Sequence, residues 1–174
     1  MAMKKKIIVS VLAAFAFSAT VVILSVCPGC SGGGNSNPAP AATPVDESMG
    51  PNGIRKDIEA YIDQTYPDSA KKRTALKSYA RALQTAYSQV NNEEEAVNME
   101  PQIINALVCV GILGEEEGGN SPSRVVEDKT SNTPERLAEQ LRYESFLDGK
   151  VFSGPSMSDD PRNVCDFDPT SLPN

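Results

Sequence analysis

The feature that most constrains this chain is an uncharged, apolar run of 20 residues, 7–26, which directly follows Lys4-Lys5-Lys6. A positive cluster followed by an apolar stretch is the order found in secretory signals. The run is longer than the roughly 7 to 15 apolar residues of a typical signal, and it lies within the roughly 17 to 25 that span a bilayer. We therefore predict that residues 1–29 are a signal peptide or a membrane anchor. In both cases we expect the lysines to stay cytoplasmic and the chain from Cys30 onward to be exported.

Two cysteines lie between this run and a glycine-rich tract, in the stretch VCPGCSGGGNS. The stretch resembles the lipobox of bacterial lipoprotein precursors, in which small residues precede a cysteine that receives diacylglycerol and becomes the new amino terminus. The resemblance implies lipidation of Cys30, with Gly29 in the small position before the cut. A second frame, with Leu24 in the usual leucine position, would instead make Cys27 the acylated residue. In this family Ser31 implies sorting to the outer membrane, where the cell has one.

The same cysteines match the bare spacing of a redox Cys-x-x-Cys motif. That chemistry needs the first sulfur at the amino terminus of a helix, where the dipole lowers the pKa of the thiol. Glycines, asparagine and proline follow Cys30, so no helix is predicted there. We favour acylation over redox chemistry, and we keep as the alternative an uncleaved signal anchor whose two cysteines have no function.

Composition limits the chemistry of the exported part. The chain has no histidine and no tryptophan, and its formal charge is −7. Without imidazole, histidine-activated nucleophiles and histidine-ligated metal sites are excluded. The acidic balance argues against nucleic acid as a partner and leaves membrane association to the leader. We predict no catalytic residues, no metal site and no cofactor, and therefore a protein that is not an enzyme.

Composition also divides the chain beyond the leader into three parts. Residues 30–53 hold the candidate acylated cysteine and are rich in Gly, Ser, Asn, Pro and Ala, which is typical of a flexible tether. Apolar residues at helical spacing extend over 54–150, and residues 151–174 are rich in Pro, Ser and Asp. We predict a mainly α fold, with a small bundle of about four helices at 54–150 and an irregular acidic tail at 151–174.

Two amphipathic segments open the predicted bundle. The first has apolar residues at helical spacing from Ile54 and ends before Pro67. The second follows a capping side chain at Asp68 or Ser69 and repeats apolar residues as far as Val90. Its opposite face carries polar residues that we expect in solvent: Lys71, Lys72, Lys77, Arg81, Gln84 and Gln89.

Two further helices complete the predicted bundle. The third opens at one of two acidic stretches, 93–95 or 100–101, and is apolar almost all round, which predicts a buried central helix; residues 107–113 also fit a buried strand. The stretch EEEGGNSPS that follows predicts a surface loop. The fourth helix begins at the capping hydroxyl of Thr133, with Leu137 and Leu141 on its apolar side.

The last two cysteines, Cys109 and Cys165, form one possible pair in an oxidising compartment. A disulfide between them would hold the tail on the third helix and stabilise the fold by up to about 4 kcal/mol. The alternative is that Cys109 is a small buried apolar side chain and Cys165 a free thiol.

The tail also carries the densest acidic cluster: Asp159, Asp160, Asp166 and Asp168. Its spacing does not match an EF-hand loop, and it lacks the glycine and the terminal glutamate of such a loop. We interpret the cluster as a solvated acidic surface and not as a calcium site.

These features favour an exported lipoprotein of the cell envelope, on the outer membrane or facing the periplasm in a Gram-negative cell. Its expected role is non-catalytic: binding or interaction with an envelope protein. One alternative is a single-pass, signal-anchored subunit of an envelope complex. Another is a carboxylate-dependent hydrolase, which would need its carboxylates gathered in a pocket.

Overall fold

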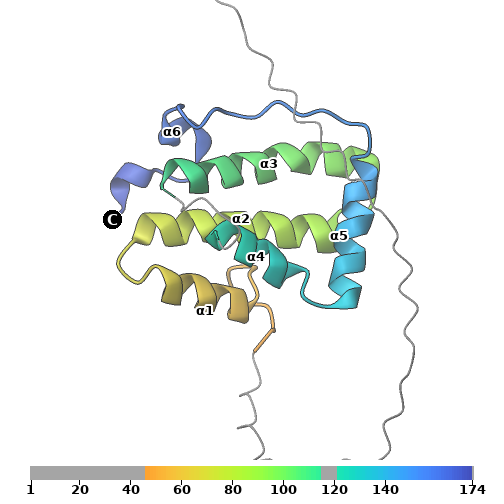
Figure 1. Cartoon of the computed structure of the whole chain (residues 1–174), viewed down its shortest axis with the longest axis horizontal. Coiled ribbons are helices and arrows are strands. Elements are labelled where there is room, and N and C mark those ends of the chain that lie inside the picture. Colours follow the sequence, from red (N-terminus) through yellow and green to blue (C-terminus); the bar gives the residue numbers. More distant parts are fainter. Residues whose placement is uncertain (1–45, 115–120, 174) are drawn as a thin grey trace, which may run out of the picture. The chain divides into compact units, whose positions relative to one another are not determined.

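The computed structural model describes residues 46–114 and 121–173, so Cys27, Cys30, the apolar run and most of the predicted linker lie outside the described residues. The predicted mainly helical fold is confirmed (Figure 1). The elements of the described part are α1 (Lys56–Thr65), α2 (Ala70–Gln89), α3 (Glu93–Ile112), α4 (Pro122–Thr130), α5 (Pro134–Phe146), α6 (Pro161–Val164) and a 3-10 helix, η1 (Pro169–Ser171). Among these, no helix is both long and apolar enough to cross a membrane.

Capping side chains begin three of the longer helices. Ser69 begins α2, Asn92 begins α3 and Thr133 begins α5, and each side-chain oxygen accepts a hydrogen bond from the backbone N–H three residues further on. Such caps satisfy N–H groups that have no partner inside the helix. The third helix therefore begins at the first of its two predicted starts, and its last turn is followed by Gly114 at a φ of 86°, which glycine adopts without strain.

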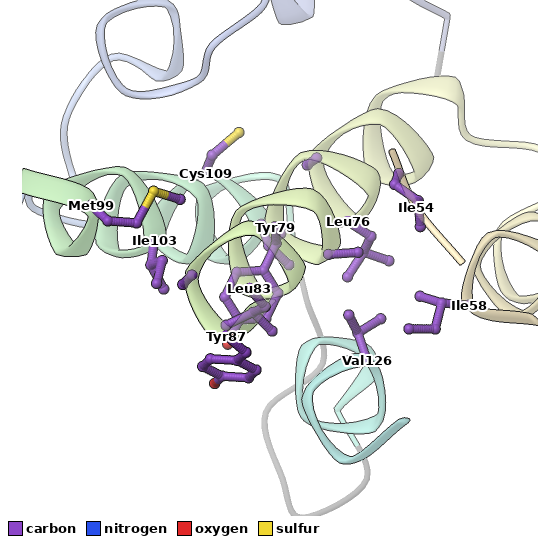
Figure 2. Close-up of a cluster of buried hydrophobic side chains, with 14 of the residues drawn as sticks. Ile54, Ile58, Leu76, Tyr79, Leu83, Tyr87, Met99, Ile103, Cys109 and Val126 are labelled. Carbon is purple, nitrogen blue, oxygen red and sulfur yellow. The ribbon is translucent and has the colours of Figure 1, made fainter. Parts of the chain in front are cut away.

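The core is built around α2. Helices α1 and α4 contact each other and one side of α2, while α3 runs along another side of it (Figure 1). Figure 2 shows Leu76 of α2 close to Ile58 of α1 and Val126 of α4, and all three side chains are fully buried. Burying a side chain of this size contributes roughly 1.5–3 kcal/mol, so this three-helix junction is a main source of stability.

Helix α4 corrects the predicted count of about four helices. Its first two residues, Pro122 and Ser123, belong to the stretch that we predicted as a loop. Apolar periodicity did not predict this helix, because the helix is only nine residues long and carries few apolar side chains. Val126 and Thr130 are buried on its inner face, and the Thr130 hydroxyl donates to the Val126 carbonyl at 2.8 Å. Packing against α1 and α2 therefore stabilises a segment whose own pattern is weak.

Helix α5 begins where predicted but packs on a different face. Leu137 and Leu141 are 46% and 55% exposed, whereas Tyr143 is buried. Arg142 explains the orientation, because its Nη1 and Nη2 donate to the carbonyls of Val90 and Tyr87 at 2.6 and 2.9 Å. These carbonyls lie at the carboxyl end of α2, where a cation is favourable. The contact turns the two leucines outward.

Helix α3 is also less buried than its composition predicts. It contacts α2 through an inner face that includes the buried Met99 and Ile103, but Leu107 is 40% exposed. The outer side is partly covered by the segment after α5, which runs along α3 (Figure 1). Gly154 allows this close approach, because a β-carbon there would lie 2.5 Å from Ile104, and Gly111 faces the terminal methyl of Met157.

The tail is more regular than predicted, since it contains α6 and η1. Two of its aspartates begin these helices: Asp160 accepts from the N–H of Arg162, and Asp168 accepts from the N–H of Thr170, both at 2.9 Å. The Arg162 side chain also pairs with Asp160 and lowers the pKa of that carboxyl to about 2. Asp160 and Asp168, two residues of the acidic tail, therefore act as helix caps.

The end of the predicted linker is attached to the helices. The N–H of Lys56 donates to the Ser48 carbonyl at 3.0 Å, and Glu47 accepts from the guanidinium of Arg136 on α5 at 2.9 Å. Ordered contacts therefore begin before residue 54, where helical periodicity starts. They are backbone bonds and ion pairs, which leave no periodic signal in a sequence.

Glu127 on α4 is expected to make the fold pH-dependent. Partial burial raises the pKa of this carboxyl; the charge of Arg124 opposes the shift, and the neighbouring carboxylates of Asp128 and Glu144 add to it. A carboxyl whose pKa is raised by folding contributes stability below its unfolded pKa and loses it as the pH rises through the folded value. We therefore expect Glu127→Gln to raise the midpoint of thermal unfolding at pH 7 and to leave it nearly unchanged at pH 4.

Glu139→Gln on the exposed side of α5 is the matched control for this measurement. It should shift the midpoint little at either pH. Equal stabilisation by Glu127→Gln at both pH values would contradict the assignment, because a neutral carboxyl and an amide differ little in solvation cost.

Candidate functional site

An open groove of about 400 Å³ lies between α2, α3 and the segment around α6. Its walls are formed by Ser78, Arg81, Ala82 and Thr85 of α2, by Met99, Gln102, Asn105 and Ala106 of α3, and by Asn163, Val164, Cys165 and Asp166. The volume lies within the roughly 300–1,000 Å³ of small-ligand sites. The groove is therefore the candidate binding site.

Helical spacing creates the two long walls. On α2 the lining positions follow one another at intervals of three, one and three residues, which places them on one face of the helix. On α3 the intervals are three, three and one. Since α2 and α3 pack on each other, these two faces converge above the contact between the helices. The apolar floor comes from Met99 and the two alanines, and the other lining residues of α2 and α3 are polar.

A disulfide positions the third wall. Cys109 of α3 and Cys165, directly after α6, are bonded, with their α-carbons 5.1 Å apart. The Ser78 hydroxyl also donates to Asp166 Oδ2 at 2.6 Å, which ties the same segment to α2. The two cysteines that the sequence offered as a pair therefore hold one side of the groove.

Arg81 is the only cationic residue that lines the groove. Its Nε donates to the backbone carbonyl of Asn52 at 3.0 Å, which holds the guanidinium in place. Within the described residues its terminal nitrogens have no protein acceptor, and no carboxylate lies within 4.0 Å of it. By contrast, Arg55, Arg73 and Arg136 each pair with a carboxylate. The outer end of Arg81 is thus available to an external acceptor.

Four neutral polar side chains complete the lining: Thr85, Gln102, Asn105 and Asn163. In the described part of the chain none of them makes a side-chain hydrogen bond to another protein group. Each amide offers a carbonyl acceptor and two N–H donors. The groove therefore presents paired donors and acceptors next to one guanidinium.

The sequence reasoning missed these groove residues. Arg81 was assigned to a solvated polar face together with Gln84, but Gln84 is buried and accepts from the N–H of Arg55 at 2.9 Å. A usable signal lay in the third helix, where Gln102 and Asn105 interrupt an apolar stretch three residues apart. Polar residues at that spacing share a helical face, which indicates either solvent or a site.

The acidic residues of the described ranges, 46–114 and 121–173, are not gathered in this groove. Asp166 is the only carboxylate among the lining residues, and it already accepts from Ser78. Asp159, Asp160 and Asp168 accept hydrogen bonds from the tail itself. Among the described residues, no group of acidic or cysteine side chains is arranged to hold a metal ion.

Comparisons with known proteins add no family or relative. No protein-family model, no curated protein and no solved structure matches this chain. The site is therefore interpreted from its own residues.

Proposed function

We propose that this protein is an exported lipoprotein, tethered to a membrane of the cell envelope through acylated Cys30, whose helical domain has a non-catalytic binding role. The leader supports export, because three lysines precede 20 uncharged residues and a cysteine that fits the lipobox resemblance. The tether places the folded part away from the bilayer, where it can reach a partner.

The observation that carries the proposal is the disulfide between Cys109 and Cys165. Disulfides persist in oxidising compartments such as the periplasm and are rare in the cytosol. A chain with an apolar leader and an intrachain disulfide therefore fits the exported side of a membrane. The signal-anchored subunit, our alternative, shares this location and differs only in keeping its leader.

The lining of the groove supports binding over hydrolysis. Hydrolysis of a glycosidic bond usually needs two carboxyl groups that flank the bond. The groove offers Asp166 alone, together with one guanidinium and several amides. Amide and guanidinium groups are suited to recognition through hydrogen bonds and poorly suited to acid–base catalysis, since they keep one protonation state near neutral pH.

The test is the intact mass of the protein extracted from bacterial membranes. We expect loss of residues 1–29 and an added diacylglyceryl group on Cys30. Cys30→Ser should abolish both changes, because acylation of the thiol precedes cleavage in this pathway, whereas Cys27→Ser should leave them intact. An unmodified full-length mass would overturn the acyl tether and favour the signal anchor.

A further inference from the structure

We propose that the groove between α2, α3 and α6 binds the carboxyl terminus of a peptide, with Arg81 pairing with the terminal carboxylate. The proposal names the ligand class of the binding role proposed above and rests on that role, but it does not require acylation or export.

The charge of the groove selects a singly charged anion. Arg81 is its one cation, held through Nε by the Asn52 carbonyl with its terminal nitrogens free of protein acceptors. A guanidinium in this state can offer two parallel N–H groups to a carboxylate, the geometry that arginine favours. Asp166 lines the same groove and would repel a second negative charge. A carboxylate fits this balance better than a phosphate dianion does.

The remaining lining fits peptide groups. Each peptide unit carries one N–H donor and one carbonyl acceptor, and the amides of Gln102, Asn105 and Asn163 offer both kinds of partner. The floor of Met99 and alanine side chains suits small apolar residues. No aromatic side chain lines the groove, so the stacking platform common in sugar sites is missing from it.

The groove also has a wall that is fixed in place. One wall is formed by the α6 segment, fixed to α3 by the disulfide and to α2 through Ser78 and Asp166. Capture of a terminal carboxylate is a known mode of peptide recognition. Arg81 supplies a cation for that carboxylate, and the α6 segment provides a fixed wall.

The test uses the full chain in detergent micelles and two probes, acetyl-Ala-Ala-Ala with a free carboxylate and the same peptide amidated. Saturation-transfer NMR of the peptide methyl signals gives the dissociation constants, and micelles without protein give the background. We expect the free acid to bind at least about tenfold more tightly than the amide, because charge-assisted hydrogen bonds are the stronger ones. Arg81→Gln should remove this difference and leave binding of the amide nearly unchanged.

Two further variants make the test specific. Arg124→Gln, an exposed arginine outside the groove, is the matched control and should bind the free acid like the wild type. Asn105→Asp adds a carboxylate to the groove and should weaken binding of the free acid more than binding of the amide, even if Arg81→Gln fails to fold. Equal binding of the two peptides, or no binding of either up to about 5 mM, would overturn the proposal. A chain that binds the free acid but is not acylated would overturn only the tether.

Discussion

Arg55→Ala should lower the free energy of unfolding by about 3–5 kcal/mol, which is the cost expected when one partner of a buried ion pair is removed. Arg55 lies directly before α1, and its side chain is 6% exposed. Its Nε and Nη2 donate to the two carboxylate oxygens of Asp57 at 2.9 and 2.6 Å. Asp57 is also buried, with 4% of its side chain exposed, so the variant would leave a carboxylate without a partner.

The same guanidinium joins α1 to the end of α4. Its Nη1 donates to the Lys129 carbonyl at 3.1 Å and to Asn132 Oδ1 at 3.2 Å. These bonds connect positions more than 70 residues apart in sequence, so their loss should also loosen the packing of α4 on α1. Chemical denaturation followed by circular dichroism measures the free energy of unfolding.

Two controls separate the buried charge from simple loss of contacts. The double variant Arg55→Met with Asp57→Leu removes both charges and should recover much of the lost stability, since apolar pairs often replace buried ion pairs at little cost. Arg162→Ala removes an exposed ion pair with Asp160 and should have little effect. If Arg55→Ala proves no more costly than Arg162→Ala, the buried pair is not a main support of the fold.

Removing the disulfide should have an effect of similar size. The cysteines are separated by 56 residues, and closing a loop of that length in the unfolded chain corresponds to roughly 4 kcal/mol of stability. We expect Cys109→Ala with Cys165→Ala to lower the free energy of unfolding by up to about this amount. Treatment of the wild type with dithiothreitol should lower it similarly.

The loss should be concentrated in the tail. Without the bond, the segment around α6 keeps the Ser78–Asp166 hydrogen bond, the backbone bond from Lys71 to Pro173 and the packing of Val164 and Phe167 on the core. Limited proteolysis should then cut within residues 151–173 before the helices α1 to α4 are attacked. Unchanged stability and unchanged cleavage in the reduced protein would show that the tail does not depend on the bond.

The sequence was sufficient to predict helices whose pattern and first residue depend on nearby residues. Helix α2 was predictable because its apolar residues repeat at helical spacing and Ser69 can satisfy a free backbone N–H at its start. The start of α5 at Thr133 was predictable for the same reason. Each of these signals lies within a few residues of the element that it defines.

Other features depend on partners far away in the sequence. The segment Pro122–Thr130 is stabilised as a helix because it packs on α1 and α2. The orientation of α5 depends on the hydrogen bonds from Arg142 to carbonyls at the end of α2. The groove exists because α2 and α3 bring polar faces together and α6 closes one side. In the sequence, Arg81 and Asn105 look like ordinary surface residues, and only the packing of α2 on α3 places them in one groove.

The helical class, the amphipathic pattern of α2, the start of α5 and the order of charged and apolar residues over 4–26 all follow from residues that are neighbours along the chain. By contrast, the choice of buried helical faces, the attachment of the tail to α3 and the gathering of polar groups in one groove depend on contacts between distant segments. Burial and hydrogen-bond pairing are set by distances between elements, and local propensity does not specify those distances.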